Sequence, residues 1–184
     1  KFPAFRVFLN SMGGSVDEAL EIGKLIRKYQ LWTDVAQGDE CLSSCFIVFM
    51  SGVTRSMSHN FYRNFELREE YQMSVENVPV GVHRMFYESE AFSELSADEA
   101  SVIYRKKSRE IESYLKNVGT PDYFIDKMNN TPSDKMFILT RSVILEAMME
   151  KNLNINDLLY DKVFYDRFKG SDIGLLDFLF QEQF

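Results

Sequence analysis

The sequence has few cysteines and no long apolar run. Two cysteines in 184 residues are too few for a disulfide scaffold, and they lack the four-ligand pattern of a structural zinc site. The longest apolar run, from Cys45 to Met50, covers six residues, whereas a helix needs about 20 to cross a bilayer. We therefore expect neither a metal site nor a membrane span in this chain.

An excess of positive charge is also missing. Lys and Arg number 21 against 28 Asp and Glu, which gives a formal net charge of −7 and argues against affinity for nucleic acid. Neither a P-loop nor a GxGxxG motif occurs, so we expect no nucleotide and no other cofactor. No repeat or linker divides the chain, and 45% hydrophobic residues supply a core for one domain over residues 1–184.

The first forty residues predict a βαβ unit. An apolar run over residues 5–9 ends in the turn Gly13-Gly14, and residues 31–36 have the composition of a second strand. Between them, Ser15 and Glu18 form a capping-box pattern at the start of a helix. The apolar residues that recur at helical spacing in this helix are Ala19, Ile22, Ile26 and Tyr29.

The rest of the chain alternates between clear and ambiguous segments. Residues 45–50 fit a strand or a buried helix, and residues 57–79 are polar without a clean period, which favours a surface loop or lid. Residues 80–84 predict a strand, and Ser96 caps a helix that runs to Gly119. We further expect a helix from Pro121 to about Asn129, a strand over 136–139, and helices over 141–151 and 155–168.

Three places have residues suited to chemistry. The Gly13-Gly14 turn precedes a helix, where backbone N–H groups can approach an anionic atom, although a plain tight turn explains it equally. Ser43 and Ser44 stand just before an apolar run, as a nucleophile or a helix cap would, and a serine reacts only with a base in reach. His83 ends an apolar strand, as a general base or a structural histidine.

Together these motifs resemble a known family. They are Asn10-Ser-Met-Gly-Gly-Ser-Val16, a serine nine residues before Gly52, and Val80-Gly-Val-His83. In this order they are similar to the proteolytic subunit of Clp protease and the wider Clp/crotonase superfamily. The Cys-x-Ser-x-Cys run, Gly-Val-His-Arg and Thr131-Pro-Ser-Asp-Lys-Met136 look like the Clp-protease-like proteins of bacterial envelopes. The resemblance covers residues 5–150, leaves 152–184 as a C-terminal extension, and makes 57–79 an inserted loop.

The resemblance implies an α/β fold of the Clp/crotonase type, a ββα spiral with a mostly parallel sheet and flanking helices. Ser43 would be the nucleophile and His83 the general base. The backbone N–H groups of Gly14 and Ser44 would form the oxyanion hole, with Ser15 a weaker candidate. The resemblance also implies that a buried helix starts at Ser43.

The third catalytic residue departs from the family pattern. The position of the family's aspartate holds Met136, and Asp134 lies two residues earlier, so either Asp134 completes a triad through a local bulge or Ser43 and His83 act as a dyad. A disulfide between Cys41 and Cys45 fits an oxidising envelope compartment, and two reduced, buried cysteines are the alternative.

The function that the resemblance implies is a serine endopeptidase, independent of ATP on this chain, that acts on peptides or proteins. A crotonase-like enzyme acting on an acyl thioester ranks low, because it would need acidic residues near the oxyanion hole. The serious alternative is a catalytically weak or inactive scaffold that binds a partner protein. The family forms homo-oligomers, so we expect one here, in the periplasm or another envelope compartment, with the cytoplasm as the alternative.

Overall fold

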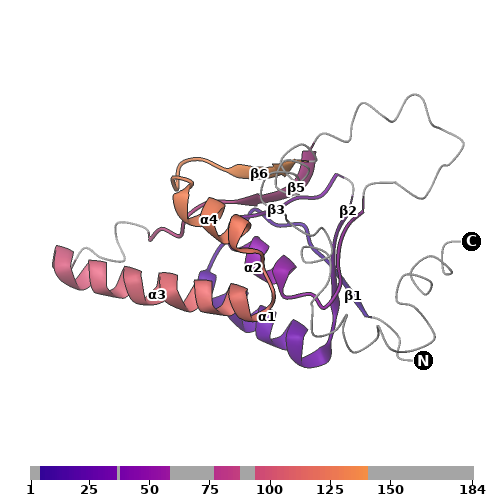
Figure 1. Cartoon of the computed structure of the whole chain (residues 1–184), viewed down its shortest axis with the longest axis horizontal. Helices are drawn as coiled ribbons and strands as arrows, with labels where there is room; N and C mark the ends of the chain where they lie inside the picture. The colour runs from indigo at the N-terminus through magenta and orange to yellow at the C-terminus, as the bar shows by residue number, and fades with distance from the viewer. Residues whose placement is uncertain (1–4, 37, 59–76, 88–93, 141–184) are drawn as a thin grey trace, which may run out of the picture.

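The computed structural model describes residues 5–36, 38–58, 77–87 and 94–140. These residues form helices and short strands in two small sheets (Figure 1). The elements are β1 (Arg6–Phe8), α1 (Val16–Tyr29), β2 (Trp32–Ala36), β3 (Cys41–Leu42), α2 (Cys45–Met50), β4 (Arg55–Ser58), β5 (Asn77–Val82), α3 (Ala97–Asn117), α4 (Asp122–Asn130) and β6 (Phe137–Thr140).

The two sheets contain three strands each. The order is β1-β2-β4 in one sheet and β3-β5-β6 in the other, and only the β5–β6 pair is antiparallel. Because β1 and β2 are parallel and α1 connects them, the predicted βαβ unit is confirmed. The described residues are therefore a mixed α/β fold with small, mostly parallel sheets and flanking helices, as expected at this coarser level.

Helix α1 begins as predicted but buries a different face. The Ser15 hydroxyl accepts a hydrogen bond from the Glu18 N–H, at 3.3 Å, and so caps the helix. The expectation that Ile22 and Tyr29 belong to the buried stripe is wrong, because both are exposed. The residues of α1 that face the core are Ala19, Leu20, Gly23 and Ile26.

Helix α2 is the centre of the core and resolves the ambiguous run as a helix. All six of its residues are buried, and it packs against α1, α3, β2, β3 and β5. In Figure 1, α2 lies at the centre of the fold. The strands lie above it and to its right, and α1 and α3 lie below it and to its left. A helix that is apolar on all faces shows no periodic alternation of apolar and polar residues. Its sequence alone therefore does not distinguish it from a buried strand, and the elements packed around it decide.

The polar segment 57–79 is shorter than expected. Its first two residues belong to β4, and Asn77, Val78 and Pro79 belong to β5. Pro79 falls where the pairing of β5 with β6 shifts register, between Asn77 and Gly81. A proline, which lacks an N–H, is tolerated in a strand at such an irregularity.

The two helices expected before residue 131 are confirmed. Helix α3 starts with a full capping box between Ser96 and Glu99, and α4 follows Pro121. The helices expected over 141–151 and 155–168, and the extension 152–184, lie outside the described residues. Among the described helices, none is long and apolar enough to cross a membrane.

Candidate functional site

Ser43 lies in a tight turn between strand β3 and helix α2. Its φ is 56°, one of two positive values among the described residues other than glycine. Its N–H donates to the carbonyl of Gly81 at 2.9 Å, and its own carbonyl accepts from the N–H of Phe46 at 3.0 Å. A left-handed residue between a strand and a helix presents its side chain at a sharp corner, as the nucleophile of many hydrolases is presented.

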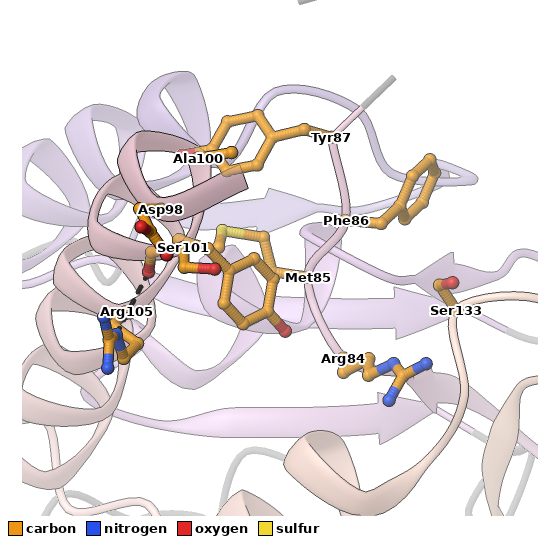
Figure 2. Close-up of a pocket in the computed structure, with 10 residues that line it drawn as sticks. Arg84, Met85, Phe86, Tyr87, Asp98, Ala100, Ser101, Arg105 and Ser133 are labelled. Atoms are coloured by element: carbon orange, nitrogen blue, oxygen red, sulfur yellow. Dashed lines mark hydrogen bonds between the residues drawn. The ribbon is translucent and has the colours of Figure 1, made fainter. Parts of the chain in front are cut away.

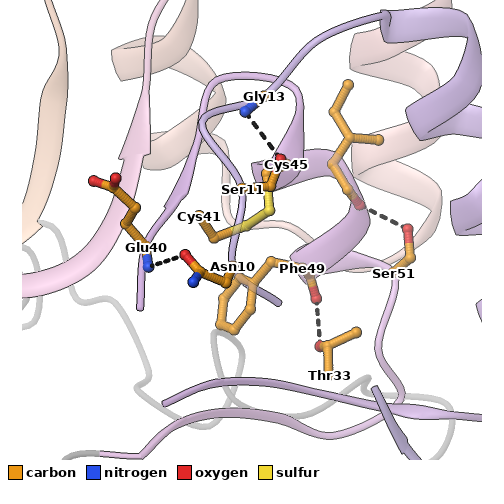
Figure 3. Close-up of a disulfide and its surroundings, with 10 residues drawn as sticks. Asn10, Ser11, Gly13, Thr33, Glu40, Cys41, Cys45, Phe49 and Ser51 are labelled. Carbon is orange, nitrogen blue, oxygen red and sulfur yellow. Dashed lines mark hydrogen bonds between the residues drawn. A yellow bond between two sulfur atoms is a disulfide. The ribbon is translucent and has the colours of Figure 1, made fainter. Parts of the chain in front are cut away.

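A disulfide closes this turn. Cys41 in β3 and Cys45 in α2 are bonded across Ser43 and Ser44, with their Cα atoms 5.1 Å apart. Both cysteines are buried (0% and 5% exposed), and Figure 3 shows the bridge between the Ser11–Gly13 segment and α2. Of the two alternatives from the sequence, the structure has the bridged form, which limits the conformations that Ser43 can adopt.

The glycine turn packs directly against Ser43. Ser11 pairs with Cys41 in parallel, and the Ser11 carbonyl accepts from the N–H of Leu42 at 2.9 Å. A Cβ atom on Gly13 would lie 2.7 Å from the Cβ of Ser43 and 2.8 Å from the carbonyl oxygen of Leu42. Position 13 therefore accepts only glycine, both for this contact and for its φ of 105°.

The two predicted oxyanion donors, Gly14 and Ser44, directly follow the two residues of this contact in the sequence. Gly14 is exposed with φ 149°, and nothing lies within 4 Å of a Cβ built on it. Within the described parts of the chain, neither Gly14 nor Ser44 donates its N–H to a hydrogen bond. Both N–H groups thus lack a hydrogen-bond acceptor among the described residues, whereas the Ser15 hydroxyl is engaged in capping α1.

His83 follows the last residue of β5 and is nearly buried (9% exposed). Its Nδ1 atom lies 2.8 Å from the carbonyl oxygen of Arg84. A carbonyl oxygen only accepts hydrogen bonds, so Nδ1 carries the proton and Nε2 of the neutral ring is left with a free lone pair. The N–H of Arg84 donates to the carbonyl of Thr131 at 2.9 Å, which holds this main-chain segment in place.

Strand pairing brings Ser43 and His83 to the same edge of a sheet. In the parallel pair β3–β5, Cys41 is opposite Val80 and Leu42 is opposite Gly81. The residues that follow the two strands therefore emerge side by side at their carboxyl ends. No hydrogen bond joins the two side chains in the described structure, and catalytic contacts in a free enzyme often tighten only when substrate binds.

Asp134 makes no hydrogen bond to His83 among the described residues. It is exposed in the turn between α4 and β6. The Nδ1 atom that an orienting carboxylate would bind is instead bonded to Arg84. Met136, at the position of the family's aspartate, packs next to Gly81. The triad expected through Asp134 is therefore not assembled in this structure.

No family model, curated protein or solved structure matches this chain. The site is therefore interpreted from its own geometry. In the described segments, no group of three or more His, Cys, Asp or Glu side chains is arranged to hold a metal ion. The arrangement combines a serine at a strained corner with a histidine Nε2 atom and two backbone N–H groups that make no hydrogen bond within the described residues.

Two features of the site are missing from the sequence-based predictions. One is the close contact of Gly13, rather than Gly14, with Ser43; the double glycine signals the turn but not which of the two glycines touches Ser43. The other is the Arg84 carbonyl as the partner of Nδ1. No sequence signal identifies a main-chain acceptor, because every residue carries one.

Proposed function

We propose that this chain is a serine endopeptidase with a Clp/crotonase-type ββα spiral fold, in which Ser43 is the nucleophile and His83 the general base. One observation carries the proposal. Ser43, in a left-handed turn packed against Gly13, and His83 follow the carboxyl ends of adjacent parallel strands. The mostly parallel sheets and the buried helix directly after Ser43 support the proposed fold.

The proposed chemistry is acyl transfer. The Ser43 oxygen attacks the substrate carbonyl carbon while Nε2 of His83 accepts the hydroxyl proton. The N–H groups of Gly14 and Ser44 donate to the oxyanion, and such donors typically contribute a few kcal/mol of transition-state stabilisation. The intermediate then expels the amine, which takes the proton from Nε2, and water hydrolyses the resulting ester by the same route.

In this mechanism the Arg84 carbonyl takes the orienting role that a carboxylate has in a triad. Its hydrogen bond fixes the tautomer that leaves Nε2 as the acceptor. Ser43 and His83 thus form a dyad, and Asp134 is not required.

Labelling with a fluorophosphonate probe, located by peptide mass spectrometry, tests the proposal. We expect Ser43 to be labelled in the native chain and labelling to disappear in Ser43→Ala and His83→Ala. Ser113→Ala, which removes an exposed serine of α3 outside the groove described below, is the matched control and should label normally. Labelling at Ser44 would move the nucleophile by one residue, and no labelling of folded protein would contradict the proposal.

A catalytically inactive scaffold that binds a partner protein is the second candidate. Two observations favour it: Ser43 and His83 share no hydrogen bond in the described structure, and Nδ1 of His83 is bonded to the Arg84 carbonyl and not to the exposed Asp134. A folded native chain that neither reacts with the probe nor cleaves peptides would support this candidate.

We also propose that the chain acts in an oxidising compartment, such as a bacterial envelope, as a homo-oligomer. The disulfide between Cys41 and Cys45 supports the compartment, because such bonds are rare where thiols are kept reduced. Light scattering coupled to size-exclusion chromatography tests the oligomer, and a monomer at micromolar concentration would contradict it.

A further inference from the structure

A groove begins directly beside His83. It has a volume of about 760 Å³ and lies between the segment Arg84–Tyr87 and the first half of α3 (Figure 2). The Phe86 ring in its wall lies 5.6 Å from the His83 ring, centre to centre. A peptide held in this groove would therefore pass next to the imidazole. The volume of the groove is typical of a ligand pocket.

The groove carries more positive than negative charge in an acidic protein. Its described lining includes two arginines, Arg84 and Arg105 on α3, and one carboxylate, Asp98, whereas the whole chain has a net charge of −7. Arg84 is exposed, and its guanidinium has no hydrogen bond or ion pair among the described residues. Arg105 uses only its Nε atom, which donates to the Ser101 carbonyl at 3.2 Å. Both guanidinium groups have donors left for a carboxylate.

Part of the wall is apolar and aromatic, while Ser101 and Ser133 add polar groups. Met85, Phe86 and Tyr104 line the groove, and Phe86 is 54% exposed. An exposed phenylalanine and two arginines with unused donors in the same lining suit a ligand that offers an apolar side chain and an anionic group together. A polyanion such as nucleic acid suits it less, because Asp98 would repel the phosphates and the apolar wall would be left uncovered.

We propose that this groove binds the substrate peptide beside the scissile bond and selects segments with an acidic side chain close to an aromatic or aliphatic one. The inference rests on the proposed peptidase function and deepens it by naming the substrate class. Arg84 and Arg105 are then specificity residues, because a guanidinium pairs with a carboxylate through two parallel hydrogen bonds.

Cleavage of matched peptides by the full chain tests the substrate class. The peptides carry one aromatic residue and differ only in Glu, Gln or Lys at the neighbouring positions. We expect kcat/KM for the Glu peptide to exceed that for the Gln peptide by about fivefold, as for exposed ion pairs, and the ratio to fall with added salt. Arg84→Gln and Arg105→Gln together should bring the ratio close to one, and Arg105→Glu should favour the Lys peptide.

Arg109→Gln is the matched control. It removes the same side chain from the same helix, one turn beyond Arg105 and outside the groove. The Glu to Gln ratio should survive this change. An equal loss in Arg109→Gln, or no preference for Glu in the native chain, would overturn the inference while leaving the peptidase proposal intact.

Binding separates the groove from the catalysis. Fluorescence anisotropy of the same labelled peptides on the full-length Ser43→Ala variant measures affinity without turnover. Tighter binding of the Glu peptide, lost in the double arginine variant, supports the groove even if Ser43 never reacts with the probe. Equal affinity for the Glu, Gln and Lys peptides, or tighter binding of a polyphosphate than of the Glu peptide, would overturn it.

Discussion

The Nδ1 atom of His83 lies 2.8 Å from a main-chain oxygen, and this contact decides what the imidazole can do. A backbone carbonyl fixes the same tautomer as a carboxylate but adds no negative charge. Arg84 is held on its other side by its bond to Thr131. The orientation of the His83 ring therefore depends on the path of the main chain and not on an acidic side chain among the described residues.

From this geometry we expect Asp134→Asn to change kcat/KM by less than about twofold, since exposed substitutions away from special features have small effects. A carboxylate that orients a triad histidine costs about 10⁴-fold in kcat when it is lost. Asp126→Asn, which alters another exposed carboxylate on the neighbouring α4, is the control. A loss of a hundredfold or more in Asp134→Asn alone would show that Asp134 moves onto His83 in the active state.

The tautomer of His83 can be measured directly, without an activity assay. The chain contains two histidines, so His59→Gln leaves His83 as the only imidazole in a nitrogen-15 NMR spectrum. In its neutral form, His83 should carry its proton on Nδ1. A proton on Nε2 would contradict the role given to the Arg84 carbonyl, whatever the activity.

At the scale of elements, the turn that holds Ser43 depends on a very short covalent loop. The disulfide joins residues only four apart, and closing so short a loop stabilises a fold by about 2 kcal/mol in the chain-entropy model. In this chain the loop contains the left-handed Ser43. Opening it frees the turn to relax, so the reactivity of Ser43 should fall together with the stability.

We expect a reductant to lower the free energy of unfolding of the native chain by about 2 kcal/mol and to slow fluorophosphonate labelling of Ser43. Urea titration and labelling time courses measure the two effects. The variant in which both Cys41 and Cys45 are alanine should have the stability and labelling rate of the reduced chain. The reductant should change neither quantity in this variant. A native chain whose labelling rate is the same with and without reductant would show that Ser43 is held by the sheet contacts alone.

Elements whose signals are local could be predicted from the sequence. Ser15 and Ser96 cap helices through bonds within their own first turns, so α1 and α3 start where the sequence indicates. The buried face of α1 was mispredicted because Leu20 and Gly23 face the core while Ile22 is exposed. Gly23 is buried because α1 packs closely against α2 and α3 at this position. A pattern within the α1 sequence does not indicate where another helix packs against it. A Cβ on Gly23 would meet Ser51 of the α2 cap and Tyr114 of α3.

The candidate site divides in the same way. Ser43, His83 and the glycine turn were found because each is marked by residue type and spacing, and the parallel β3–β5 pair brings the first two to one edge. The partner of His83 was missed because it is a main-chain atom. The groove was also missed, because it joins Arg84 to Arg105 across segments that no motif connects.

At the scale of the whole molecule, one buried arginine ties the two halves of the fold together. Arg55 at the start of β4 is 2% exposed. Its Nε atom donates to the carbonyls of Met50 and Gly52, both at 3.1 Å, and another guanidinium nitrogen donates to the carbonyl of Val118. Met50 is the last residue of α2 and Gly52 follows the C-cap of that helix, whereas Val118 is the C-cap of α3. The core helix and the long helix are thus held by the same side chain.

Arg55→Met should therefore destabilise the entire fold. The substitution keeps an unbranched side chain but leaves three buried carbonyls without this donor, and each unsatisfied group costs about 1–3 kcal/mol. Because neighbouring groups relax, we expect a total loss of about 3 kcal/mol in urea unfolding, with one cooperative transition. Arg55→Lys should lose nearly as much, because one ammonium group cannot replace the planar fork that reaches both helices. The exposed Arg109→Met should stay within about 0.5 kcal/mol of the native chain. If Arg55→Met unfolded in two separate transitions, α2 and α3 would belong to independent units, and Arg55 would only join them.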